Sequence, residues 1–158
     1  MFKFWNKILT KKIDKEDIST STFNSNDEDV KIGASIVNGY EVESYMYESG
    51  SYTSIKVSIN GHRLGMVKCV IQNQELKITD IEIFDEEYKN KGYGSELMKR
   101  LLEYSEKRKI KKIIGELSKV DDDHKEMLFH FYKKFGFDIT LYNELKNNFY
   151  GSIEKVLW

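Results

Sequence analysis

Apolar and polar residues alternate with a period of two through much of the first half of the chain, from residue 30 onward. Such alternation is typical of β-strands that bury one face. Four well-marked strands are expected, over residues 40–48, 51–59, 62–70 and 76–84. Asn60 and Gly61 favour a tight hairpin turn between two of these strands, and Gln72 and Asn73 predict the next turn. The first half therefore predicts an antiparallel meander.

A helical period replaces the alternation from residue 92. Segment 92–109 predicts a helix with one apolar face, which is formed by Leu97, Met98, Leu101 and Leu102. Its other face carries two pairs of opposite charge four residues apart, Glu96 with Arg100 and Glu103 with Lys107. Pairs with this spacing stabilise a helix.

The remaining segments predict further strands around a second helix. We expect strands over residues 111–117, 137–142 and 151–157. Aspartates at positions 121–123 offer N-caps for a helix over residues 124–135, and Gly136 suits the left-handed position that ends a helix. The element order predicts an α/β chain with a mixed sheet, in which antiparallel strands precede helix, strand, helix, strand and strand.

The first 28 residues differ from the rest and predict an N-terminal extension to a domain over residues 29–158. Phe2, Trp5, Ile8 and Leu9 recur at helical spacing with lysines between them, and a polar stretch follows that is typical of a linker. Two interpretations remain open. The segment is either a basic amphipathic helix that docks on a membrane or a partner, or a terminal helix that packs on its own domain.

The composition indicates a globular protein of one-domain length, because the chain has 158 residues, 40% of them hydrophobic and 32% charged. Twenty-five basic and 26 acidic residues give a net charge of -1, so we expect no nucleic-acid partner. A single cysteine, Cys69, excludes an internal disulfide and a cysteine-based zinc cluster and favours a reducing, cytoplasmic location. No apolar run approaches the ~20 residues that span a bilayer.

The main chemical signal lies where strand 76–84 leads into the first predicted helix. Gly92 and Gly94 open this helix, so a ligand can approach its first free N–H groups, and Lys89 and Lys91 add positive charge. A pyrophosphate fits such a site, whereas the alternative is a glycine-rich turn with no ligand. The P-loop pattern is absent, and Leu97 stands where a dinucleotide fingerprint needs its third glycine.

Two segments in this context resemble motifs of one enzyme family. Residues 89–94, KNKGYG, resemble the Q/R-x-x-G-x-G/A signature of the GNAT family of N-acetyltransferases, with lysine at the Q/R position. Residues 131–137, FYKKFGF, resemble the family's F/L-Y-x-K-x-G-F segment. The resemblance implies a GNAT-like acyl-CoA N-acyltransferase fold, acetyl-CoA as the acetyl donor, no metal, and direct attack by an amine in a ternary complex.

The resemblance also implies where the cofactor binds. In the family a splayed strand end presents backbone amides to the acyl oxygen and the pantetheine arm, and the matching residues here are Ile83, Phe84 and Asp85. The pyrophosphate would lie on the glycine-containing segment. The residues of that segment are Lys89, Asn90, Lys91, Gly92, Tyr93, Gly94 and Ser95.

Two further residues are candidates for proton transfer. Tyr132 matches the family's tyrosine that protonates the departing thiolate, although its alternative role is that of a packed aromatic residue on an apolar helix. Glu82 neighbours the cofactor strand's end and is the candidate general base. Rival bases are Asp80, Asp123 and His124.

The sequence departs from the family pattern in three places. Lys125 stands where an asparagine is usual, residues 83–89 are one residue longer than usual, and no helix pair is evident between residues 30 and 59. A second function therefore stays open, namely a degenerate acyl-CoA-binding sensor or interaction module. The acceptor is expected to be an amine on a small molecule or a protein, and a monomer and a homodimer both stay open.

Overall fold

The structure is a computed structural model, and it describes residues 2–3 and 29–158. The strands in this part of the chain are β1 (Phe2–Lys3), β2 (Val30–Val37), β3 (Tyr40–Ser49), β4 (Tyr52–Ile59), β5 (His62–Gln72), β6 (Glu75–Ile83), β7 (Lys112–Ser118), β8 (Asp138–Lys146) and β9 (Phe149–Val156). They form one sheet in the order β2-β3-β4-β5-β6-β7-β9-β8, and β1 pairs with β6 outside this order. Only the β1–β6 and β6–β7 pairs are parallel, so the predicted mixed α/β fold is confirmed.

The antiparallel meander runs from β2 to β6, and its turns follow from local sequence. Asn60 and Gly61 both have positive φ, 47° and 77°, which confirms the predicted tight turn. The next turn is built by Asn73 and Gln74, with φ of 50° and 64°, rather than by Gln72 and Asn73. Gln72 instead remains in β5, where it pairs with Glu75.

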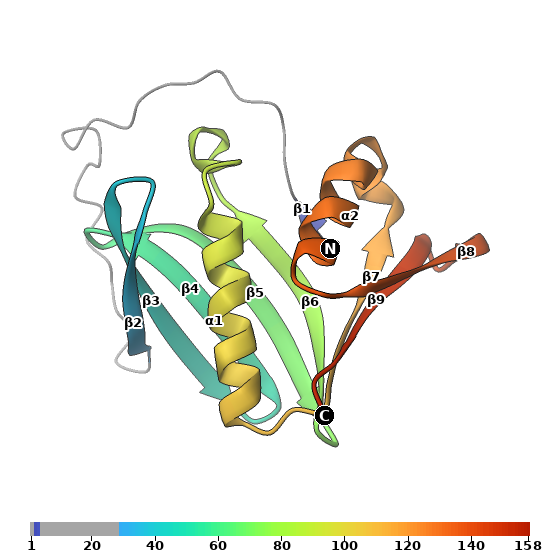
Figure 1. Cartoon of the computed structure of the whole chain (residues 1–158), viewed down its shortest axis with the longest axis horizontal. Helices are drawn as coiled ribbons and strands as arrows, with labels where there is room; N and C mark the ends of the chain where they lie inside the picture. The colour runs from blue at the N-terminus through green and yellow to red at the C-terminus, as the bar shows by residue number, and fades with distance from the viewer. Residues whose placement is uncertain (1, 4–28) are drawn as a thin grey trace.

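Helix α1 (Tyr93–Lys107) packs on the face of the sheet formed by β4, β5 and β6 (Figure 1). The predicted pair of Glu96 and Arg100 is present, with 3.1 Å between Oε1 and Nε. Glu103 pairs with Arg100 as well, at 3.1 Å, so the predicted partner Lys107 is wrong. Apolar side chains of α1 and of the strands beneath it form the core, and Cys69 is buried there as a small apolar residue, which raises the pKa of its thiol.

The second helix begins differently from the prediction. A 3-10 helix η2 (Lys119–His124) takes in the aspartates at 121–123, so they do not cap α2 (Lys125–Lys134). The hydroxyl of Ser118 accepts the N–H of Val120 and so caps η2, whereas His124 precedes α2 with no side-chain cap. Gly136 has a φ of 80°, in agreement with its predicted position at the end of this helix.

Strands β6 and β7 pair over only part of their length, and this positions the site. Their parallel pairing ends at Ile78 and Gly115, after which β6 continues to Ile83 without β7 beside it. Strand β1 pairs with β6 beyond this point, with Phe2 opposite Ile81 and Lys3 opposite Glu82 (Figure 1).

The pairing of β1 shows that Phe2 and Lys3 are extended, so the predicted helix does not begin there. Trp5, Ile8, Leu9 and the predicted linker up to residue 28 lie outside the described residues. Residues 30–59 form β2, β3 and β4 and contain no helix, as the sequence indicated. None of the helices in the described residues has the length and apolar character needed to cross a membrane.

Candidate active site

The segment between β6 and α1 makes one short 3-10 turn before the helix begins. Asp85 is extended, with φ −114° and ψ 139°, and η1 (Glu86–Tyr88) follows it. Tyr88 is buried in this turn, where its ring lies 5.7 Å from the ring of His62 and 6.2 Å from that of Tyr93. This turn lies just ahead of the glycine-containing segment.

The first turn of α1 presents backbone N–H groups at its open end. The first intrahelical bond runs from the N–H of Glu96 to the carbonyl of Gly92, at 3.0 Å, so the amides of residues 93–95 have no acceptor within the helix. Gly92 is the N-cap and offers no side chain to these amides. Together with the helix dipole, such amides attract an anion.

Gly92 is required by its backbone conformation, whereas Gly94 is not. The φ of Gly92 is 91°, which L-residues rarely adopt, and a Cβ there would lie 3.3 Å from Cγ1 of Val37. Gly94 lies within the helix and is outside the set of residues with positive φ. Its backbone conformation therefore does not demand glycine, and because Gly94 is buried, its lack of a side chain leaves room for close contacts.

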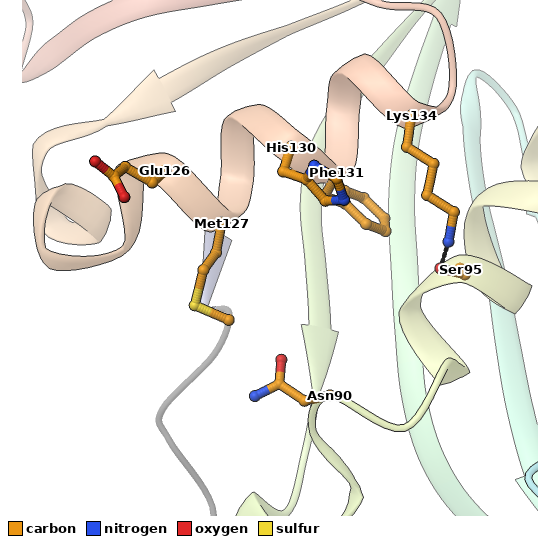
Figure 2. Close-up of a pocket in the computed structure, with 7 residues that line it drawn as sticks. All are labelled: Asn90, Ser95, Glu126, Met127, His130, Phe131 and Lys134. Carbon is orange, nitrogen blue, oxygen red and sulfur yellow. Dashed lines mark hydrogen bonds between the residues drawn. The ribbon is translucent and has the colours of Figure 1, made fainter.

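Two lysines at this end of α1 donate hydrogen bonds to neighbouring side chains. The ammonium of Lys89 donates to Oε1 of Glu86 at 2.7 Å and is only slightly exposed. The ammonium of Lys134, at the end of α2, donates to the hydroxyl of Ser95 at 3.1 Å (Figure 2). A cation from α2 thus stands beside the first turn of α1.

A cavity of about 340 Å³ lies between the start of α1 and one face of α2 (Figure 2). Its lining residues are Asn90, Ser95, Glu126, Met127, His130, Phe131 and Lys134. Asn90 and Ser95 were predicted from the sequence, and Phe131 and Lys134 belong to the second motif. The sequence analysis did not predict the other three lining residues, Glu126, Met127 and His130. Their spacing of three and four residues places them on one helix face, and this spacing could have identified them.

The end of β6 presents two of the three predicted amides to its open edge. The N–H of Phe84 donates to the carbonyl of Leu64 on β5 at 2.9 Å, so it is not available to a ligand. Successive N–H groups of a strand point to opposite sides, so those of Ile83 and Asp85 face away from β5. This is the side that β7 leaves open and on which β1 pairs. The side chain of Ile83 is buried in the core, so only its backbone can serve a ligand.

Tyr132 and Glu82 do not line the cavity. Tyr132 is fully buried in α2, where its ring packs edge-on against Phe131 and Phe137 with ring centroids 5.3 Å and 5.5 Å away. Glu82 lies between buried Ile81 and Ile83, so its side chain points to the face of the sheet turned away from α1. The two proposed proton-transfer residues therefore come from different elements, and the structure does not bring them together in this cavity.

The rival bases fall into two groups. Asp80 shares the face of Glu82, two residues away on β6. Its Oδ1 atom is buried and has no hydrogen-bond partner among the described residues. Asp123 and His124 instead lie in η2, and Asp123 is exposed.

Two side-chain contacts near these elements were not signalled by the sequence. Nε2 of His62 lies 3.6 Å from Oδ2 of Asp85, an ion pair when the imidazole is protonated. Lys125, at the position where asparagine is usual, places its ammonium 4.5 Å from the ring centroid of Tyr150. Among the described residues, no group of histidine, cysteine, aspartate or glutamate is arranged to hold a metal ion.

Comparisons with known proteins agree with this geometry. The model of the acetyltransferase (GNAT) family matches residues 19–137. A similar structure is that of the ribosomal-protein-S18-alanine N-acetyltransferase from Escherichia coli, at 19% identity and a TM-score of 0.54, covering 68% of each chain. The comparison with curated proteins found no match.

Two similar structures were solved with coenzyme A. The PaiA N-acetyltransferase from Thermoplasma acidophilum has 16% identity and a TM-score of 0.55, over 67% of this chain and 61% of that one. An acetyltransferase from Bacillus subtilis has 17% identity and a TM-score of 0.56, over 68% of this chain and 78% of that one. At these identities, the likeness shows a shared fold.

Proposed function

The chain belongs to the acetyltransferase (GNAT) family, and from this premise we propose that it transfers the acetyl group of acetyl-CoA directly to an amine. The observation that carries the proposal is the open end of α1. There the amides of residues 93–95 lie beside the cavity between α1 and α2, and the end of β6 that leads into this segment is not covered by β7. The coenzyme A complexes of the two similar structures support the use of an acyl-CoA.

We assign the pyrophosphate to the amides of residues 93–95, where the helix dipole stabilises its charge. Lys91 adds positive charge, and so does Lys89 once it leaves Glu86. Ser95 and Asn90 line the cavity next to these amides and are in position to contact the adjoining part of the cofactor.

The acyl end belongs at the edge of β6 that β7 leaves open. The amides of Ile83 and Asp85 face this edge and are the donors for the acyl oxygen and the pantetheine amides. An N–H aimed at the oxyanion that develops during acyl transfer contributes roughly 3 kcal/mol. Phe84 does not donate its N–H to the cofactor in this proposal, because that N–H is bonded to the carbonyl of Leu64.

The chemical step moves one acyl group and two protons. The neutral amine attacks the thioester carbonyl carbon, the C–S bond breaks, and Glu82 or a water molecule bound to it takes the proton of the attacking nitrogen. Tyr132 returns a proton to the thiolate, since a phenol is a proton donor that can serve as a general acid. Both assignments follow the family motif, and Tyr132 requires a path from its buried hydroxyl to the sulfur.

Residues 29–158 form the catalytic domain in this proposal, with residues 1–28 as an extension. The single cysteine favours a reducing compartment, and we propose the cytoplasm. The test of function is thiol release from acetyl-CoA with a broad panel of amines. Thiol release that depends on an amine supports the enzyme. Tight binding of acetyl-CoA with no release for any amine would instead identify an acyl-CoA sensor.

A further inference from the structure

A second concave site lies on the face of the sheet turned away from α1. This cavity measures about 390 Å³ and is formed by side chains of β3, β4 and β5 together with Asp29. The charged and aromatic residues that line it are Lys56, Arg63, Lys68, Asp29, Tyr47 and Tyr52. Three cations therefore share the cavity with one carboxylate.

The register of the sheet places this cavity beside the candidate bases. Met66, which lines the cavity, is directly opposite Glu82, and Lys68 is directly opposite Asp80. Adjacent strands lie about 4.8 Å apart, so the cavity and the two carboxylates of β6 are separated by one strand spacing. Residues that are directly opposite each other in a pair share a face.

The charges of this cavity are not balanced within the described residues. Asp29 is almost fully buried and accepts two hydrogen bonds from the ammonium of Lys56, at 2.9 Å and 3.0 Å. The same carboxylate lies 3.7 Å from Nη2 of Arg63, so both Lys56 and Arg63 are engaged. Lys68 is the cation of this cavity that makes no ion pair with any described residue.

Strand β6, next to this cavity, carries carboxylates on the same face. Oδ1 of Asp80 is buried and has no donor among the described residues, and Glu82 lies two residues further along on the same face. A buried carboxylate oxygen without a donor is costly, and an ammonium group supplies donors and charge together. The face thus offers positive charge at Lys68 and negative charge one strand away, at Asp80 and Glu82.

We infer that this face binds the acceptor, and that the acceptor is a small amine that also carries a carboxylate, as an amino acid does. The inference rests on the proposed acetyl transfer and specifies its substrate class. The ammonium binds at Asp80 and Glu82 and loses its proton to Glu82, and the neutral amine attacks the thioester while Lys68 holds the carboxylate. Polyamines and aminoglycosides offer Lys68 no carboxylate and would bring a further positive charge close to it.

The experiment is a steady-state assay with matched acceptors. Each of the common amino acids is compared with the amine that lacks its α-carboxylate, and spermidine represents the polyamines. We expect an amino acid to exceed its matched amine at least tenfold in kcat/KM, because a hydrogen bond between charged groups contributes that much. Amines without a carboxylate that are used equally well, or a preference for spermidine, would overturn the inference.

A lysine series tests the cavity itself. Lys68→Gln should raise KM for the preferred amino acid about tenfold with little change in kcat, and Lys68→Arg should restore it. Lys107→Gln, at an exposed position near the end of α1, is the matched control and should leave both constants unchanged. An unchanged KM in Lys68→Gln would contradict the assignment.

The failure of this inference is separable from that of the proposed function. Titration with acetyl-CoA should give the same affinity in Lys68→Gln and in the unchanged chain, since Lys68 lies away from α1. Retained acetyl-CoA binding and amine acetylation without a carboxylate preference refutes the acceptor class alone. Loss of acetyl-CoA binding in the unchanged chain refutes both.

Discussion

The ammonium of Lys134 lies 3.1 Å from the hydroxyl of Ser95 and so joins the end of α2 to the first turn of α1 (Figure 2). A positive charge therefore stands at the point where we place the pyrophosphate. Lys134→Ala should weaken acetyl-CoA binding about tenfold, as expected for one charge-assisted contact. Lys133→Ala, its exposed neighbour, is the control. Isothermal titration at two salt concentrations measures the effect, and equal affinities in the two variants would remove Lys134 from the site.

Gly92 is predicted to combine a conformational role with a binding role. Gly92→Ala should destabilise the fold by about 1 to 2 kcal/mol because of its φ of 91°. It should also weaken acetyl-CoA binding, since the helix amides would shift. Gly50→Ala is a matched control, because Gly50 has a φ of 58° and open space around it. Denaturant unfolding and titration separate the two effects. Equal loss of affinity in both variants would point to general destabilisation.

Strand β1 occupies the edge that the proposed acyl site needs. Phe2 and Lys3 pair with Ile81 and Glu82, next to the proposed donor Ile83, so we expect this pairing to compete with the binding of acetyl-CoA. The double variant Phe2→Pro/Lys3→Pro removes two N–H groups and should therefore bind acetyl-CoA a few-fold more tightly. Phe2→Ala/Lys3→Ala keeps the backbone donors and is the control. Unchanged or weaker binding in the proline variant would show that β1 does not compete.

Tyr132 is predicted to act in the chemical step more than in binding. Tyr132→Phe keeps the ring that packs against Phe131 and Phe137, so the affinity for acetyl-CoA should stay within a few-fold. Turnover should fall by ~10² to 10⁴ if the hydroxyl protonates the thiolate. Tyr104→Phe removes a buried hydroxyl that contacts Thr53 on β4, and it should alter stability but not the rate. Full activity in Tyr132→Phe would pass the role to water.

The strands and the first helix could be predicted because their signals are local. Alternation predicted β3, β4 and β5, and Asn60 with Gly61 predicted the hairpin turn between β4 and β5. The start of α2 could not be predicted from the aspartates alone, because residues 121–123 lie within a 3-10 helix that Ser118 caps. The pairing of β1 involves only two residues, and a pattern of that length carries no periodicity.

A β-bulge in β6 decides which face of the sheet each side chain of this strand lies on, and the sequence pattern did not predict it. Lys68 lies opposite Asp80 and Cys69 lies opposite Ile78, so Thr79 is the extra residue of a β-bulge, and its hydroxyl donates to the carbonyl of Lys68 at 3.2 Å. A strict period of two would place Ile78 and Asp80 on one face, whereas the bulge turns Asp80 to the opposite face. The proposed cofactor segment could therefore be predicted from the sequence, whereas the proposed acceptor face depends on the register of β5 and β6.

The most direct test of the central claim is thermal unfolding with acetyl-CoA. At ~100 times its dissociation constant the ligand should stabilise the fold by ~2.7 kcal/mol. For a chain of this length, that raises the melting temperature by roughly 5 to 10 °C. NAD at the same concentration should give no shift, since the third glycine of a dinucleotide site is replaced by Leu97. A melting temperature that does not change with acetyl-CoA or any other acyl-CoA would contradict the account.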